Sequence, residues 1–191
     1  SVLVEERRIS VRPDKLTPRE VAPGGTAIIV STRGRPDIVN ALVGQLAEQT
    51  KAPGHIFIVG TSAADIARLD SNTPGLTAMV GREGSSSQRN DGLALAGSRF
   101  SYIVFLDDDF VPSRFWIERM EAVFEANPDI AGLTGIVLAD GTTTAGIGLE
   151  DAQAMVRACD NDADDAVRVH CRLNYRDNMG CNMAFRPSAL T

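Results

Sequence analysis

The stretch YIVFLDDDFVP, residues 102–112, combines the pattern of a buried strand with an unusual charge cluster. Residues 102–106 form a continuous apolar run, typical of a strand that is covered on both faces in a parallel sheet. Three carboxylates, Asp107, Asp108 and Asp109, follow at once. A helix N-cap would account for one of them, but not for three. We therefore expect a binding or catalytic site at the end of this strand.

Outward from this stretch, apolar runs alternate with segments of helical periodicity. The sequence predicts strands at 26–30, 55–59 and 76–80, and helices at 36–46, 63–69, 91–96 and 112–127. This alternation predicts an α/β, Rossmann-like three-layer domain with a mostly parallel central sheet flanked by helices. Ligands of such sheets bind beyond the carboxyl ends of the strands, where the aspartates are expected to lie.

The pattern is weaker after residue 137. We expect a loop at 139–148, a short helix at 150–158, an acidic loop at 159–165 and a strand at 166–171. Residues 1–25 are expected to be an N-terminal extension, and residues 26–191 a single domain. A chain of 191 residues that is 43% hydrophobic can build one sizeable core.

Composition limits the classes of partner. The chain has 19 basic and 25 acidic residues, a formal charge of -6, which argues against a general nucleic-acid binder. No apolar run approaches the ~20 residues that span a bilayer, so we expect no membrane span and a cytoplasmic chain. The three cysteines have the spacing of neither a zinc site nor a disulfide framework.

Adjacent carboxylates raise each other's pKa unless a cation neutralises them. Side chains alternate along a strand, so continued strand geometry would place Asp107 and Asp109 on one side and Asp108 on the other. Mg²⁺ or Mn²⁺ would neutralise such a pair, and these ions fill their other positions with water and phosphate oxygens. The pattern therefore predicts a divalent metal and a phosphate ester as ligands.

Four segments together suggest a family. They are AIIVSTRGRP (27–36), SSSQRNDGLALA (85–96), YIVFLDDDFVP (102–112) and MGCNMAFRPSAL (179–190). In this order and at these intervals they resemble the family 2 glycosyltransferases of the GT-A fold, over roughly Thr26–Leu190. The resemblance implies transfer of a sugar from a UDP- or GDP-linked donor to a hydroxyl of a sugar, lipid-linked or small-molecule acceptor, with inversion.

The resemblance also implies roles for individual residues. Asp107 and Asp109 match the ends of the family's Asp-x-Asp, which holds Mn²⁺ or Mg²⁺ and the donor's diphosphate and ribose, while Asp108 matches its variable middle position. Related members use adjacent carboxylates, so the metal-binding pair stays open. The remaining donor-binding matches are Ser31, Thr32 and Arg33 beside the base, Arg89 and Asn90 near the nucleotide, and Gly180 and Asn182 on the sugar side.

Two departures from the family pattern affect base recognition and catalysis. Gly60 and Thr61 stand where the family carries acidic residues that read the base. The family's catalytic acid follows the Asn-Met-Ala-Phe segment, so we expect the base beyond Thr191, with Asp177 as the nearest upstream candidate. The chain therefore resembles a member truncated at its C-terminus.

Two other functions are compatible with these residues. One is a nucleotide-sugar-binding domain without catalytic activity, because the expected base is missing. The other is a haloacid-dehalogenase-like phosphatase, because FLDDDFV also fits its Asp-x-Asp motif. That chemistry needs a downstream cation, usually lysine, and the chain's two lysines, Lys15 and Lys51, both lie upstream of the motif.

Overall fold

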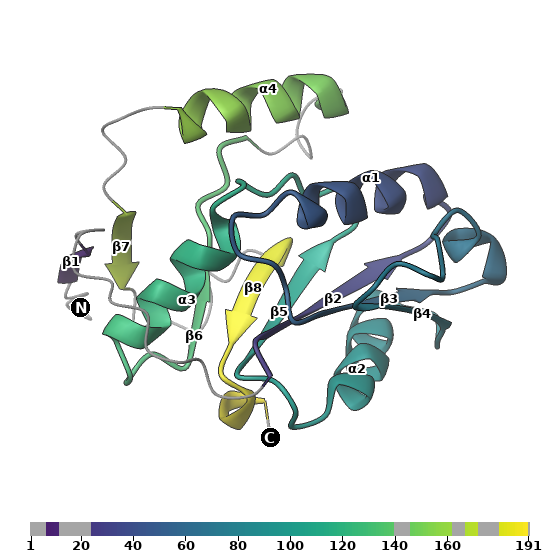
Figure 1. The fold of residues 1–191 in the computed structure, drawn as a ribbon, viewed down its shortest axis with the longest axis horizontal. Coiled ribbons are helices and arrows are strands. Elements are labelled where there is room, and N and C mark those ends of the chain that lie inside the picture. Colours follow the sequence, from purple (N-terminus) through teal and green to yellow (C-terminus); the bar gives the residue numbers. More distant parts are fainter. Residues whose placement is uncertain (1–6, 12–23, 140–145, 162–166, 172–179, 191) are drawn as a thin grey trace, which may run out of the picture.

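The computed structural model describes residues 7–11, 24–139, 146–161, 167–171 and 180–190. These residues centre on a six-stranded sheet with the order β4-β3-β2-β5-β8-β6 (Figure 1). Within it, β8 is antiparallel to both of its neighbours, whereas β2, β3, β4 and β5 pair in parallel. The strands are β2 (Thr26–Thr32), β3 (His55–Gly60), β4 (Leu76–Val80), β5 (Tyr102–Asp107), β6 (Gly132–Thr134) and β8 (Asn182–Phe185).

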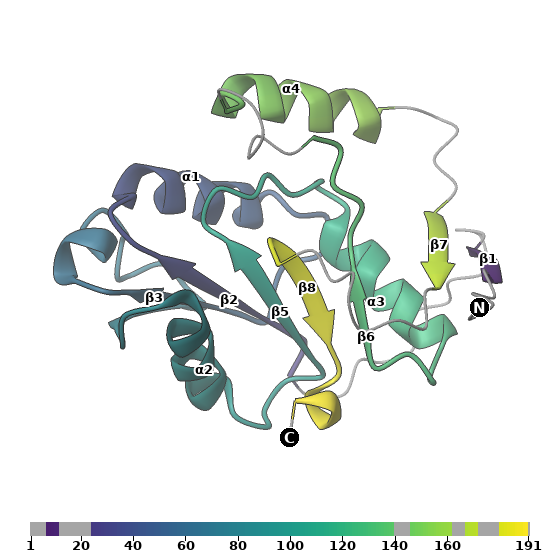
Figure 2. The same cartoon turned by 180° about the vertical axis from the view of Figure 1, so that it is seen from behind.

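Helices cover both faces of this sheet, which confirms the predicted three-layer α/β architecture (Figures 1 and 2). Alternation along β2 shows the layers, because Ile28 and Val30 pack in the cluster that holds α1 and α3, and Ala27 and Ile29 in the cluster that holds α2. Gly92 lets α2 approach closely, since a Cβ there would lie 2.4 Å from an Ile29 methyl. The helices are α1 (Pro36–Ala47), α2 (Ser85–Ala96) and α3 (Trp116–Ala126).

Three helices differ from their predicted extents. The helix predicted at 91–96, α2, begins six residues earlier, at Ser85. The segment 63–69 is only a short 3₁₀ turn, η2 (Ala63–Ile66). The helix predicted at 112–127, α3, begins at Trp116 instead of Pro112, because the residues before Trp116 form hydrogen bonds with another part of the chain. The carbonyl of Arg114 accepts a hydrogen bond from the amide of Thr50 at 2.9 Å. This bond connects the segment before α3 to the loop that follows α1.

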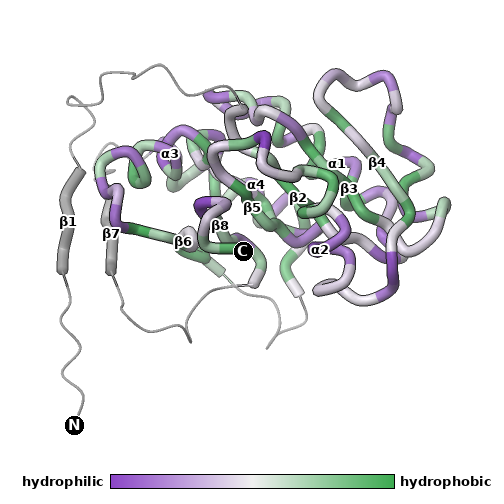
Figure 3. The backbone as a smooth tube through the Cα atoms, turned by 90° about the horizontal axis from the view of Figure 1, so that it is seen from below, coloured by the Kyte–Doolittle hydropathy of each residue, from purple (hydrophilic) through white to green (hydrophobic). Residues whose placement is uncertain are grey.

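The predicted helix and strand after residue 148 are both present. They are α4 (Leu149–Asp160), none of whose residues is buried, and β7 (Val167–Cys171). The strand β1 (Arg7–Val11), within the segment predicted to be an N-terminal extension, was not predicted and pairs antiparallel with β7. Figure 3 shows that hydrophobic stretches concentrate along the strands of the larger sheet, whereas hydrophilic ones lie around them.

Candidate functional site

The carboxyl ends of four parallel strands meet at one edge of the sheet. Ser31 in β2 aligns with Asp107 in β5 on one side and with Val59 in β3 on the other. Thr32 aligns with Gly60, the last residue of β3. The segments that follow these strands are far apart in the sequence, so the topology alone brings them into one site.

Asp107 is the last residue of β5 and forms one part of this site. Its Oδ1 accepts a hydrogen bond of 2.6 Å from Nη2 of Arg89, which comes from α2. The same nitrogen donates to the carbonyl of Gly180 at 2.9 Å. The structure therefore brings together three residues that the sequence predicted separately.

Asp108, the next residue in the sequence, is buried, with only 7% of its surface exposed. One carboxylate oxygen accepts a hydrogen bond of 2.7 Å from the Thr32 hydroxyl, and the other lies 3.1 Å from Nη1 of Arg35. Burial raises the pKa of Asp108, and the nearby charge of Asp109 adds to this, while the bonds from Thr32 and Arg35 oppose it.

Asp109 shares a cation with Asp108 instead of with Asp107. Its Oδ2 lies 2.7 Å from the same Arg35 nitrogen, and both carboxylates raise the pKa of that arginine. The expected strand alternation does not extend past Asp107, because β5 ends there and the Phe110 amide closes a turn onto the Asp107 carbonyl. Asp108 and Asp109 are thus the pair that converges on one positive charge.

The loop after β2 also contacts the loop after β4. Arg33 forms an exposed ion pair with Glu83, from the segment that precedes α2. Gln88, buried in α2, donates to the carbonyls of Thr32 at 2.9 Å and Val59 at 2.6 Å, and so holds the ends of β2 and β3 together. Asn90, predicted beside Arg89, is exposed and has no hydrogen bond or ion pair to the aspartates among the described residues.

Asp65 connects two loops at this edge of the sheet and was not predicted from the sequence. It is 4% exposed and accepts hydrogen bonds from the amides of Gly34, Thr61 and Ser62 at 2.7, 2.8 and 2.9 Å. Burial alone would raise its pKa, but these bonds and one from the Thr61 hydroxyl lower it to about 2. The Ser-x-x-Asp spacing of a capping box, with Ser62 as its first residue, was the available signal.

Asn182 lies in β8 and is completely buried. Its Oδ1 accepts hydrogen bonds from the Gly135 amide at 2.5 Å and the Thr134 hydroxyl at 3.1 Å. The side chain therefore connects β8 to the end of β6, and its predicted contact with the donor sugar stays a prediction. The candidate base Asp177 falls outside the described residues.

The residue types at this edge fit a divalent cation. Two carboxylates already share one positive charge at Arg35, and Mg²⁺ typically uses one or two carboxylates together with phosphate oxygens. In the part of the chain that the structure describes, no group of three or more His, Cys, Asp or Glu residues is arranged to hold a metal by itself. Water molecules or phosphate oxygens would therefore have to supply the rest of the coordination.

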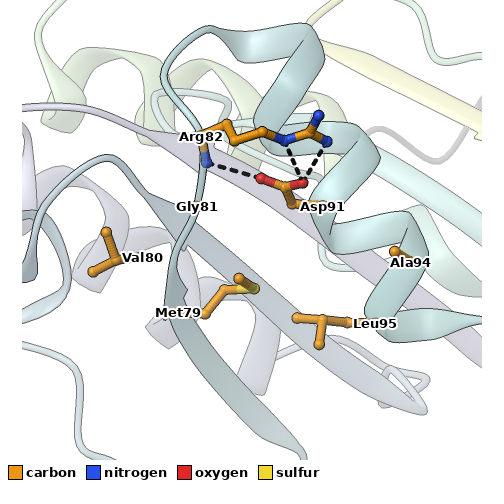
Figure 4. Close-up of a pocket in the computed structure, with 7 residues that line it drawn as sticks. All are labelled: Met79, Val80, Gly81, Arg82, Asp91, Ala94 and Leu95. Carbon is orange, nitrogen blue, oxygen red and sulfur yellow. Dashed lines mark hydrogen bonds and ion pairs between the residues drawn. The ribbon is translucent and has the colours of Figure 1, made fainter.

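A hollow lies beside this edge, between β4 and α2 (Figure 4). It measures about 450 Å³, and Met79, Val80 and Leu95 provide apolar walls. At its mouth, Nε and Nη2 of Arg82 donate to Asp91 at 2.9 and 2.5 Å. Hydrogen bonds from Arg82 lower the pKa of Asp91. The hollow contains none of the three aspartates and is distinct from the candidate site.

Comparison with protein families gives a match over residues 27–190, to the family described as glycosyl transferase family 2. This chain belongs to glycosyltransferase family 2. No curated protein sequence matches it. The family match covers all four segments on which the resemblance was based, and it gives no support to the phosphatase alternative.

Solved structures resemble this chain at low sequence identity. A mannosyltransferase from Pyrobaculum calidifontis, in complex with GDP-Man and Mn²⁺, is 15% identical with a TM-score of 0.57, covering 89% of this chain. The present chain spans about half of that protein, 48% of its length. TarS from S. aureus is 17% identical with a TM-score of 0.49, covering 65% of this chain and 23% of its own.

The fold also occurs in enzymes with other chemistry. CMP:2-keto-3-deoxy-manno-octonic acid synthetase complexed with CTP is 8% identical with a TM-score of 0.52, covering 87% of this chain and 76% of its own. The fold alone thus does not separate sugar transfer from nucleotidyl transfer, whereas the family match does. No helix in the described ranges is both long enough and apolar enough to span a membrane.

Proposed function

We propose that this family 2 domain binds a nucleoside-diphosphate sugar through a divalent cation and transfers the sugar to an acceptor hydroxyl with inversion. The observation that supports it best is the convergence of Asp108 and Asp109 on one positive charge at the end of β5, with Asp107 beside them. A cation at these carboxylates would hold the donor's diphosphate at the edge where ligands of parallel sheets bind.

Each part of the site has a defined task in this proposal. The family resemblance predicts Asp107 and Asp109 as the metal ligands and leaves open which adjacent pair is used. Because Asp108 and Asp109 converge on one positive charge, we propose these two as the pair that binds the metal, with Asp107 beside them. When bound, Mn²⁺ or Mg²⁺ would stabilise the negative charge of the departing diphosphate. Arg89 orients Asp107 through its 2.6 Å hydrogen bond, and Ser31, Thr32 and Arg33 border the base.

Inversion also requires a carboxylate that takes the proton of the acceptor hydroxyl. Asp177 is the candidate for this role within the chain, with a residue beyond Thr191 as the alternative. A UDP- or GDP-linked donor, a sugar, lipid-linked or small-molecule acceptor, and a cytoplasmic location complete the proposal. A domain that binds the donor without turning it over is the second possibility, and turnover distinguishes the two.

The first experiment is calorimetric titration with UDP, GDP and their common sugar conjugates, in Mn²⁺, Mg²⁺ or excess chelator. We expect binding only in the presence of metal, and its loss in the Asp107→Ala/Asp109→Ala variant. The matched control is Glu125→Ala/Asp129→Ala, which should bind as the wild type does. It removes two exposed carboxylates, of which Glu125 lies near Tyr102 at the start of β5 and not at the end that carries the aspartates. Release of nucleoside diphosphate from the bound donor then separates a transferase from a binding domain. A folded chain that binds none of these nucleotides would overturn the proposal.

A further inference from the structure

Arg35 has a fixed backbone and a partly free side chain. It immediately precedes Pro36 at the start of α1, and its carbonyl accepts the first helical hydrogen bond from the Val39 amide at 3.1 Å. The preceding residue, Gly34, has a φ of +68° and is anchored by its amide to the buried Asp65. The Arg35 side chain is 49% exposed, so its guanidinium can move while its attachment point stays in place.

One nitrogen of this guanidinium serves two carboxylates. Nη1 of Arg35 lies 3.1 Å from Oδ1 of Asp108 and 2.7 Å from Oδ2 of Asp109. The other oxygen of Asp108, Oδ2, accepts a hydrogen bond of 2.7 Å from the Thr32 hydroxyl. Oδ1 is therefore the oxygen of Asp108 that can bind a cation. Arg35 therefore binds one oxygen of each carboxylate, and both of these oxygens contact the same nitrogen.

The charge of the cluster is largely balanced by the protein itself. Three aspartates face two arginines, because Arg89 pairs with Asp107 as Arg35 does with the other two. A divalent ion that binds the same oxygens must displace the guanidinium or lie beside it against like-charge repulsion. In both cases, Arg35 weakens binding of the metal when the donor is absent.

We infer that Arg35 is a donor-dependent counter-ion: it competes with the divalent metal for Asp108 and Asp109, and pairs with the donor's diphosphate once the metal has replaced it. This inference rests on the proposed function. A metal held by these carboxylates also binds phosphate oxygens, so the diphosphate arrives within reach of the displaced guanidinium. Guanidinium groups bind phosphate through charge-assisted hydrogen bonds. The Arg35 guanidinium, which competes with the metal, thereby becomes a ligand of the donor. Metal and donor should therefore each bind more tightly when the other is present.

The inference predicts effects of opposite sign from one substitution. In Arg35→Gln, the affinity for Mn²⁺ alone, measured by the relaxation of water protons, should rise roughly fivefold, because a competing exposed ion pair is removed. In saturating Mn²⁺, the affinity for GDP or UDP, whichever the wild type binds, should fall roughly tenfold, because a charge-assisted hydrogen bond to phosphate is lost. A residue with only a structural role would weaken both affinities together.

Two further variants make the test specific. Arg68→Gln removes an equal charge from the exposed ion pair with Asp37 and should leave both affinities unchanged. Arg35→Lys keeps the competing charge and should bind Mn²⁺ alone as weakly as the wild type does; it also serves if Arg35→Gln does not fold. Wild-type nucleotide binding with no rise in Mn²⁺ affinity in Arg35→Gln would overturn this inference and leave the proposed function intact. Absence of nucleotide binding in the wild type would overturn both.

Discussion

At the scale of single residues, Asp108 is a carboxylate whose charge opposes folding. It is 7% exposed at the end of a strand, and burial raises its pKa above the ordinary value. A carboxyl group with a raised pKa in the folded state costs stability once the pH exceeds that pKa, and the cost disappears as the pH falls below the unfolded-state value. The bonds from Thr32 and Arg35 offset only part of this cost.

We therefore expect Asp108→Asn to increase the free energy of unfolding at pH 7 by up to ~1 kcal/mol. The amide oxygen can still accept the hydrogen bond from Thr32, and Arg35 keeps Asp109 as its partner. Urea denaturation at several pH values tests this, since the difference from the wild type should shrink as the pH is lowered. The same variant should lose metal-dependent nucleotide binding. A loss of stability at pH 7 would show that the charge of Asp108 supports the fold.

At the scale of elements, Asp65 joins the loop after β2 to the loop after β3. Its bonds to the amides of Gly34, Thr61 and Ser62 hold its pKa at about 2, against an ordinary value of 3.8. This lowered pKa contributes stability above the unfolded-state value, equal to about 2 kcal/mol for the 4% exposed carboxylate. The contribution is lost as the pH falls from about 4 towards 2.

Asp65→Asn should therefore lose about 2 kcal/mol of stability at pH 7, because the amide nitrogen cannot accept the hydrogen bonds that one carboxylate oxygen receives. The difference in unfolding free energy between Asp65→Asn and the wild type should narrow as the pH falls from about 4 towards 2. Guanidinium chloride denaturation at several pH values measures this difference. The control Asp70→Asn changes an exposed aspartate whose side chain bonds to the nearby Asn72, and it should alter stability by less than ~0.5 kcal/mol. Equal stability of Asp65→Asn and the wild type at pH 7 would contradict this account.

Elements with strong local patterns were predictable, and contacts between distant loops were not. The apolar runs at 26–30 and 102–106 correctly predicted β2 and β5, because both strands are buried on both faces. The strands β6 and β8 were missed, since runs of three and four residues carry too little periodicity. The partners of Asp108 were likewise not predictable, because Thr32 and Arg35 lie more than 70 positions earlier in the sequence.

At the scale of the whole molecule, the two ends of the sheet have different tasks. The carboxyl end of β2 carries the candidate site, and its first residue, Thr26, belongs to a buried polar group at the opposite end. There, Glu121 of α3 is 2% exposed, accepts a hydrogen bond from the Thr26 hydroxyl and forms an ion pair with Lys51. The seven residues of β2 separate the two ends by roughly 20 Å.

This separation predicts a substitution that affects stability without affecting the site. Lys51→Met removes the positive partner of Glu121 and leaves the carboxylate of Glu121 buried without this counter-charge. The free energy of unfolding should fall by about 2 kcal/mol. This loss is smaller than for a fully buried pair, because the Lys51 side chain is 40% exposed. Thermal denaturation should register this loss, whereas Mn²⁺-dependent nucleotide affinity below the transition should equal that of the wild type. Arg68→Gln, which breaks an exposed pair, should leave the melting temperature nearly unchanged. A parallel fall in nucleotide affinity in Lys51→Met would mean that the two ends of the sheet are coupled, because α3 and β2 would then transmit the change across the core.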